Sequence, residues 1–235
     1  MSNELNTYVL ENQGYIFLKN VFQREVIEQF NASMNDYFIK HQVMMYLQKP
    51  MDMDLENFYV NNTYSQMDTF EKNIRYQKPV FENRGVKNRV NDINAYDFHQ
   101  AQKIFPNLLE IFQIKTLEAI LNKTTSSRWR FDRVNIHISN NVKNPIGFHS
   151  DGLKDEIRVM IYLSDLPETS YGTPSFISHT HTPTGRANGI KKEYIKTFTG
   201  NKGDILISYE NGLHRKLPQE INCINGFVCF HFVKM

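Results

Sequence analysis

The segment Phe148-His149-Ser150-Asp151-Gly152 carries two potential metal ligands separated by one residue. On a β-strand, two such side chains point the same way, because side chains alternate between the two faces with a period of two. His214, on a later β-like segment, would bring a third ligand from a distant part of the chain. Two imidazoles and one carboxylate on one face of a metal leave coordination positions open, as in non-haem Fe(II) sites.

The alternative interpretation is a surface turn at 149–152 beside an unrelated histidine, because H-x-D alone is a common pattern. The context favours the metal site: 144–147 (NPIG) has the composition of a turn, and 203–207 (GDILI) begins the strand that leads to His214. The other histidines have weaker patterns. We expect a loop role for His179 and His181, a core or site position for His137, and surface or core positions for His41, His99 and His231.

Strands must position these ligands, and the chain after residue 125 is rich in strand-like segments. Short runs of β-branched and aromatic residues alternate there with turns that contain Gly, Pro and Asn. The runs are 128–140, 156–166, 172–178, 203–209 and 226–235. Their number and order predict a double-sheet jelly roll, a double-stranded β-helix of the cupin-like type, with the ligands inside the barrel.

The first 125 residues are predicted to support this barrel with helices, which makes the fold mainly β with a helical buttress (α+β). Residues 14–22 alternate as a strand, and apolar residues recur at helical spacing from Val26 to Phe38. A second helix is predicted over 106–122, whereas 41–100 indicates a short helix or two and irregular loops. We expect one domain over 1–235, with 1–125 packing on a jelly-roll core at 126–235.

Composition excludes several classes of protein. The chain has 40% apolar residues, and 27 basic against 25 acidic residues give a net charge of only +2. This balance gives no excess of positive charge of the kind that binds nucleic acid, and no apolar run is long enough to cross a membrane. The N-terminus does not resemble a signal peptide. Cys223 and Cys229 are expected to be reduced thiols, which fits a cytoplasmic setting.

Four segments in order resemble the phytanoyl-CoA dioxygenase-like branch of the Fe(II)/2-oxoglutarate-dependent oxygenases. They are the opening strand and helix (11–30), RVNIHIS followed by FHSDG, the stretch 159–181 that ends in SHTH, and GDILISYENGLHRKLP (203–218). The resemblance covers most of the chain. It implies a double-stranded β-helix whose chemistry couples oxidative decarboxylation of 2-oxoglutarate by O₂ to hydroxylation of an unactivated C–H bond.

The resemblance also assigns roles to residues. It makes His149, Asp151 and His214 the Fe(II) ligands and therefore the catalytic residues. Related halogenases have a small residue in place of the carboxylate, so the presence of Asp151 favours hydroxylation or another oxidation.

The chain departs from this family after the distal histidine. The family has an arginine about ten residues later, which binds the far carboxylate of 2-oxoglutarate, whereas this chain has Asn222 and Asn225 there. Either another cation has this role or the co-substrate differs. Our candidates for binding 2-oxoglutarate share strands or faces with the ligands: Arg158, Asn135, Tyr162 and Lys216. Arg158 and Tyr162 lie on the polar face of 156–163, which would be the cavity side of a barrel that holds a ligand.

Evidence on the substrate is limited. Arg133 matches a position that reaches the co-substrate or substrate in relatives, but it also suits a salt bridge of the scaffold. The loop 179–200 contains Arg186 and three lysines, and 84–89 adds further positive charge. These residues would suit an acidic or carrier-bound small molecule, and a solvated loop is the plainer interpretation. Two other functions stay open: an iron enzyme that does not use 2-oxoglutarate, and a jelly-roll binding module without catalysis.

Overall fold

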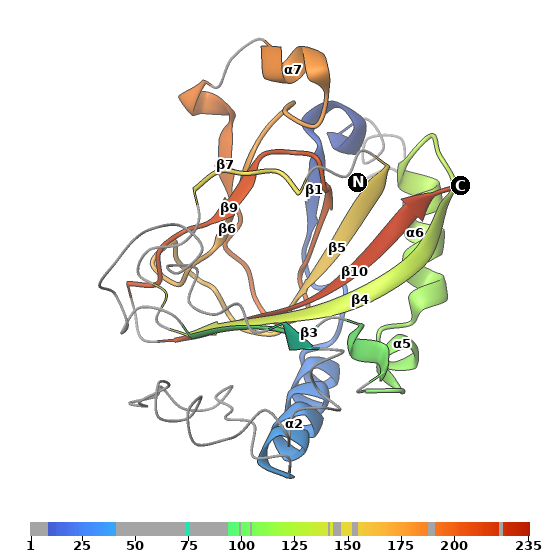
Figure 1. Cartoon of the computed structure of the whole chain (residues 1–235), viewed down its shortest axis with the longest axis vertical. Helices are drawn as coiled ribbons and strands as arrows, with labels where there is room; N and C mark the ends of the chain where they lie inside the picture. The colour runs from blue at the N-terminus through green and yellow to red at the C-terminus, as the bar shows by residue number, and fades with distance from the viewer. Residues whose placement is uncertain are drawn as a thin grey trace.

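The computed structural model describes residues 9–40, 74–75, 94–98, 100–103, 105–140, 142, 147–151, 155–187, 191–220 and 223–235. These residues form two antiparallel sheets with a few helices, an arrangement consistent with a jelly-roll-type fold (Figure 1). Most of 41–100, for which short helices and loops were predicted, lies outside the described residues, as does the basic segment 84–89.

The larger sheet has seven strands in the order β1-β8-β5-β10-β4-β3-β2. The strands are β1 (Tyr15–Leu18), β2 (Ile74–Arg75), β3 (Asn94–Phe98), β4 (Trp129–Asn140), β5 (Glu156–Tyr162), β8 (Ile205–Tyr209) and β10 (Ile224–Lys234). The smaller sheet has the order β7-β6-β9, with β6 (Pro174–Ile177), β7 (Ile195–Thr197) and β9 (His214–Lys216). The strand runs predicted after residue 125 are confirmed.

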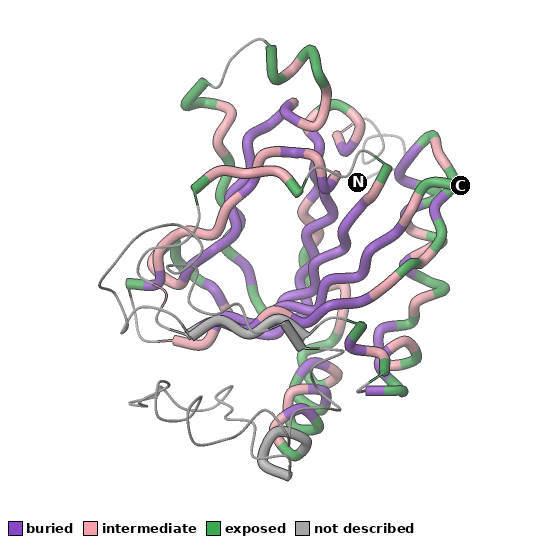
Figure 2. Tube along the Cα trace, viewed as in Figure 1, coloured by how far each residue is buried: buried purple, intermediate pink, exposed green. Residues whose placement is uncertain are grey.

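Strand β10 is the centre of the larger sheet, because it pairs with β4 along its whole length and with β5 on its other edge. Its residues 225–232 are all buried, and Figure 2 shows the same continuous burial along most of β5. A strand buried on both faces must be covered on both sides. Helices cover one side, and the smaller sheet covers the other.

The helical side of the larger sheet is packed by α2 (Arg24–Lys40), α5 (Leu108–Ile111) and α6 (Ile114–Thr124) (Figure 1). Ile27, Phe30 and Met34 of α2 recur every three or four residues and are all buried. Phe30 contacts Phe112 edge-to-face, with ring centroids 5.1 Å apart. The helical periodicity from residue 26 onward therefore marked the face that packs on the sheet.

The single helix predicted over 106–122 is instead two helices with a break between them. Gln113 has a left-handed backbone with φ of 47°, so α5 ends and α6 begins in a new direction. The spacing explains the break: the step from buried Phe112 to buried Leu117 is five residues, which is too long for one face of a continuous helix. The break lets both residues reach the core.

The other side of the larger sheet faces the smaller sheet across a second apolar cluster. Its buried members are Tyr15, Met160, Tyr162, Leu166, Phe176, Phe198, Leu206, Phe227 and Cys229. Strand β5 contributes to both clusters, since Ile157, Val159 and Ile161 pack on the helical side whereas Met160 and Tyr162 point to the smaller sheet. The prediction that Arg158 and Tyr162 share the interior face is thus confirmed.

The loop 179–200 contains α7 (Pro183–Ala187), the 3-10 helix η4 (Lys192–Tyr194) and strand β7 (Figure 1). Its two histidines anchor the loop. His179 Nδ1 donates to the carbonyl of Asn12 at 2.7 Å, and His181 Nε2 donates to the carbonyl of Glu11 at 2.9 Å. Both cysteines are free thiols, and none of the described helices is long and apolar enough to cross a membrane.

Candidate metal centre

A pair of reciprocal backbone hydrogen bonds joins the two ligand histidines. His149 N donates to His214 O at 3.0 Å, and His214 N donates to His149 O at 2.8 Å. This isolated antiparallel bridge adds residue 149 to the edge of the smaller sheet beside β9. The two imidazoles are therefore cross-strand neighbours, with ring centroids 4.6 Å apart.

Asp151 completes the group. Its Oδ2 lies 3.4 Å from His214 Nε2, and its Oδ1 lies 3.8 Å from His149 Nε2. One ligand atom from each of the three residues lies within 4.8 Å of the others, and no other such group occurs among the described residues. The backbone N–H of Asp151 donates to Glu210 O at 3.2 Å, which ties the carboxylate's segment to the end of β8.

Hydrogen bonds fix the orientation of both rings. His149 Nδ1 donates to Gly147 O, and His214 Nδ1 donates to Gly212 O, each at 2.9 Å. A protonated Nδ1 leaves Nε2 with a free lone pair for a metal. The ring of Phe176 also stacks on His214, with centroids 5.2 Å apart and planes 22° from parallel. Both imidazoles thus have the tautomer and the direction that a metal ligand needs.

Arg158 lies against the carboxylate ligand. Its Nη1 is 3.5 Å from Asp151 Oδ2, and its Nε is 3.3 Å from Glu210 Oε1. Burial alone would raise the pKa of Asp151, but its polar contacts with His214 and Glu210 and the charge of Arg158 outweigh it and hold that pKa well below its ordinary value. Asp151 is therefore an anion, as a metal ligand should be.

Glu210 is a site residue that sequence reasoning missed. It is 1% exposed, and burial raises its pKa to about 7, against the opposing charge of Arg158. Its Oε1 also lies 3.2 Å from His231 Nδ1, whose pKa burial and the charges of Arg133 and Arg158 lower well below the ordinary value. The sequence contains a pattern that could have identified it. Leu206 and Ser208 of β8 and Glu210, directly after that strand, occur at every second position, so their side chains are expected on the same, interior face.

The other residues considered for 2-oxoglutarate have different surroundings. Tyr162 is fully buried, and its hydroxyl donates to Phe198 O at 2.8 Å. Asn135 Nδ2 lies 3.2 Å from His231 Nε2, and its Oδ1 accepts from Gln100 N at 3.3 Å. Lys216 is half-buried, and its Nζ lies 4.8 Å from the centroid of the Phe227 ring.

The two arginines considered for the substrate make scaffold contacts. Arg133 forms a fork on Glu156, at 3.1 and 2.9 Å, and also contacts Asp132. Arg186 donates to Thr180 O at 2.7 Å and to Asn211 O, which holds the loop 179–187 to the turn before β9. The Arg133 contacts match the scaffold salt bridge that was one of the two interpretations from the sequence, whereas the contacts of Arg186 were not predicted.

Asn225, at the position where the resembling family has an arginine, also holds the scaffold. It is fully buried, and its Nδ2 donates to Tyr171 O at 3.1 Å and to Gly172 O at 2.6 Å. Asn222 lies outside the described residues. The amide of Asn225 thus fastens the turn that precedes β6.

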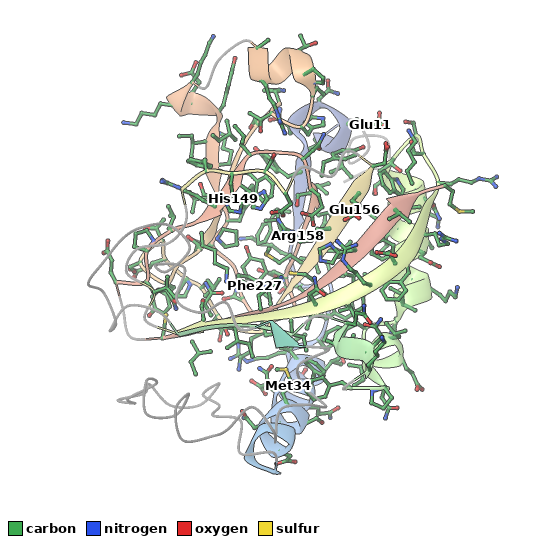
Figure 3. All side chains as sticks on the ribbon, viewed as in Figure 1. Glu11, Met34, His149, Glu156, Arg158 and Phe227 are labelled. Atoms are coloured by element: carbon green, nitrogen blue, oxygen red, sulfur yellow. The ribbon has the colours of Figure 1, made fainter. Side chains whose placement is uncertain are left out.

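The donor set suits Fe(II) in its chemistry. Two neutral imidazoles and one carboxylate on one face leave positions for a bidentate 2-oxo acid and for O₂. His149 and Arg158 come from opposite sheets and lie on facing sides of the interior (Figure 3).

The sequence matches no family model and no curated protein, whereas its fold matches solved structures. The non-heme alpha-ketoglutarate-dependent epimerase SnoN from nogalamycin biosynthesis has a TM-score of 0.68 at 11% identity, over 98% of this chain and 82% of that chain. The carbocyclase SnoK of the same pathway gives 0.66 at 12% identity, over 99% and 84% of the two chains. HygX from Streptomyces hygroscopicus with nickel and 2-oxoglutarate gives 0.59 at 12%, over 99% and 87%.

These similarities of fold agree with a ligand group assembled from His149, Asp151 and His214. At 11–12% identity they establish the fold and leave the reaction open. The chain has the fold of the non-heme alpha-ketoglutarate-dependent enzymes.

Proposed function

We propose that this protein is a Fe(II)/2-oxoglutarate-dependent oxygenase that oxidises an unactivated C–H bond of a small molecule. The observation that carries the proposal is the ligand group itself: three donors within 4.8 Å, with both histidines hydrogen-bonded through Nδ1 so that Nε2 is free. A protein that only binds a ligand has no need for an open metal face with prepared tautomers. We place it in the phytanoyl-CoA dioxygenase-like branch, with a double-stranded β-helix as a single domain.

When bound, Fe(II) and 2-oxoglutarate supply the oxidising power by reaction with O₂. The chain's own residues have other tasks. His149, Asp151 and His214 hold the metal, and Arg158 keeps Asp151 ionised and in place. Phe176, which stacks on His214, would shield that ring from water, whereas the side chains of His149 and Asp151 are partly exposed. Hydroxylation is the default outcome, and desaturation or ring closure would use the same residues.

A small organic substrate, in specialised metabolism, fits the proposal. One structure of SnoN is a complex with Fe3+, alpha ketoglutarate and nogalamycin RO, and one of HygX contains nickel, 2-oxoglutarate and hygromycin B. Arg133 and Arg186 are tied to the scaffold in this chain, so we propose that they shape the mouth of the site and that contact with an acidic substrate is secondary. A cytoplasmic location would suit both the free thiols and Fe(II).

A difference spectrum tests the metal and the co-substrate together. Anaerobic protein with Fe(II) should develop a weak visible charge-transfer band when 2-oxoglutarate is added. The band should be absent from His149→Ala and His214→Ala. If Fe(II) binds to the wild type and no band forms, the enzyme uses iron without 2-oxoglutarate, a second function that the neutral Asn225 favours. If Fe(II) does not bind, the protein is a binding module.

A further inference from the structure

The turn between β8 and β9, residues 210–213, contacts two members of the candidate metal-binding group. Glu210 O accepts from the backbone N–H of Asp151 at 3.2 Å. Gly212 O accepts from Nδ1 of His214 at 2.9 Å. The position of this turn therefore determines where Asp151 lies and how the His214 ring is oriented.

The other two carbonyls of the turn are held by residues 177–186, which lie far away in the sequence. Leu213 O accepts from Ile177 N at 2.9 Å, and Asn211 O accepts from the guanidinium of Arg186. The four carbonyls of the turn thus alternate along the chain. The first and third hold the ligand residues, and the second and fourth are held by the segment 177–186.

Thr180 is the most buried side chain that this segment contributes to the contact. Its hydroxyl donates to Ile177 O at 2.7 Å and accepts from Leu213 N at 2.8 Å. Leu213 directly precedes His214, and Thr180 is only 1% exposed. Without the hydroxyl, the N–H of Leu213 would lose its partner in the protein interior, which is unfavourable unless the backbone moves to find another.

Further hydrogen bonds join the segment to the turn in both directions. Arg186 Nε donates to Thr180 O at 2.7 Å, while the same guanidinium reaches Asn211 O. The side chain of Asn211 returns a hydrogen bond, since its Nδ2 donates to His181 O at 2.7 Å. The hydroxyl of Thr180 contacts backbone atoms, so it would act on the metal-binding group through the turn.

We infer that Thr180 is a positioning residue of the candidate metal centre. Its hydroxyl fixes the backbone before His214 and thereby directs Nε2 of that ring toward the position that it shares with Asp151. Arg186 acts on the same turn from its exposed side. The inference rests on the proposed function, because it assumes that His149, Asp151 and His214 bind a metal ion.

The test separates the hydroxyl of Thr180 from the shape of its side chain. Thr180→Val keeps the branched shape and loses the hydroxyl, whereas Thr180→Ser keeps the hydroxyl. We expect the Co(II) affinity, measured by calorimetry, to fall about 10-fold in Thr180→Val, the lower end of the range for groups that support a metal ligand. Thr180→Ser should retain the affinity of the wild type. The visible absorption of bound Co(II), which reports the coordination geometry, should change only in Thr180→Val.

Thr173→Val is the matched control. Thr173 is fully buried, and its hydroxyl has no hydrogen-bond partner among the residues that the structure describes. Its Co(II) affinity and absorption should equal those of the wild type. Urea unfolding of the metal-free variants measures any general loss of stability, which by itself would leave the absorption of bound Co(II) unchanged.

Wild-type affinity and absorption in Thr180→Val would overturn the inference, and so would equal weakening in Thr180→Ser or Thr173→Val. If Thr180→Val does not fold, Arg186→Met tests the same turn, and Co(II) binding that is unchanged in this variant would contradict the inference. Failure of the wild type to bind Co(II) would overturn the proposed function, and this inference with it.

Discussion

Arg158 lies directly against Asp151, a member of the candidate metal-binding group, with 3.5 Å between Nη1 and Oδ2. The same guanidinium contacts buried Glu210 through Nε, so one cation serves two carboxylates inside the protein. From the sequence, Arg158 is a candidate for binding 2-oxoglutarate. Its contacts with Asp151 and Glu210 give it a structural task, which is to fix the charge and position of the carboxylate that would hold a metal.

Replacing Arg158 should lower the free energy of unfolding, and the size of this loss should depend on whether Glu210 is present. Arg158→Met leaves a buried carboxylate without its cation, and breaking a buried ion pair in this way costs about 3–5 kcal/mol. The double variant Arg158→Met/Glu210→Met should cost less than the sum of the two single variants, since neither charge is then left alone. Urea unfolding of the metal-free proteins measures this coupling.

A surface pair is the matched control for that cycle. Lys115 and Glu118 are 3.3 Å apart, with the lysine side chain 88% exposed, so Lys115→Ala should change the free energy of unfolding by no more than about 0.5 kcal/mol. Purely additive costs for Arg158 and Glu210 would contradict the buried pairing.

Loss of either ligand histidine should abolish tight metal binding. We expect His149→Ala and His214→Ala to weaken Co(II) affinity, measured by calorimetry, by more than the about 10–100-fold that is typical of losing a group that only supports a ligand. His179→Asn is the control, because His179 has φ of 70° and asparagine tolerates this conformation. Equal weakening in all three variants would mean that the metal binds elsewhere.

His181 should make stability depend on pH. Burial lowers the pKa of His181 below its ordinary value of 6.5, with a smaller contribution from the charge of His179. As the pH falls through 6.5, His181 of the unfolded chain binds a proton that the folded protein does not bind. The free energy of unfolding should therefore decrease as the pH drops from about 7.5 to 5.5.

The variant His181→Phe isolates this contribution. The phenyl ring can keep the stacking on Tyr209, where the planes are 13° from parallel, and it cannot titrate. The free energy of unfolding of the variant should therefore fall less steeply over the same pH range. The free energy of unfolding of the variant should still rise with pH, because the pKa of buried His231 is also lowered. Identical slopes for the two proteins would exclude His181 as a source of the pH dependence.

The break between α5 and α6 also gives a stability prediction. Gln113 is exposed and has a left-handed backbone, which costs about 1–2 kcal/mol for a residue with a Cβ atom. Gln113→Gly should raise the melting temperature, whereas Gln113→Ala should not. A continuous helix over 106–122 would give the reverse order, since glycine destabilises a helix interior relative to alanine.

The sequence made the strands predictable because their side chains alternate with a period of two, whereas the roles of His149, Asp151 and His214 as metal ligands stay a prediction. Alternation predicted that Arg158, Met160 and Tyr162 share the interior face of β5. Residues 147–151 are not a continuous strand, and backbone hydrogen bonds to His214 and Glu210 bring His149 and Asp151 together. Helical periodicity likewise identified Ile27, Phe30 and Met34 as the buried face of α2.

Partners across the fold were not predictable, because they depend on which strands become neighbours. Nothing local indicates that Glu210 meets Arg158 and His231, or that the amide of Asn225 holds the turn at Gly172. The helix break was not predicted, since 106–122 has acceptable helical composition throughout and only the five-residue step from Phe112 to Leu117 departs from helical spacing. Charge in the sequence therefore showed which residues could bind an anion, and only the fold shows which of them are already paired.

The bridge between His149 and His214 has a mechanical consequence. Both histidines belong to the smaller sheet, whereas Asp151 is tied through its N–H to Glu210 at the end of β8 in the larger sheet. An ion bound to all three side chains would therefore link the smaller sheet to the larger sheet. Metal occupancy would then decide whether the two layers separate one at a time or together on heating, and binding of a metal ion to the folded protein would raise its stability.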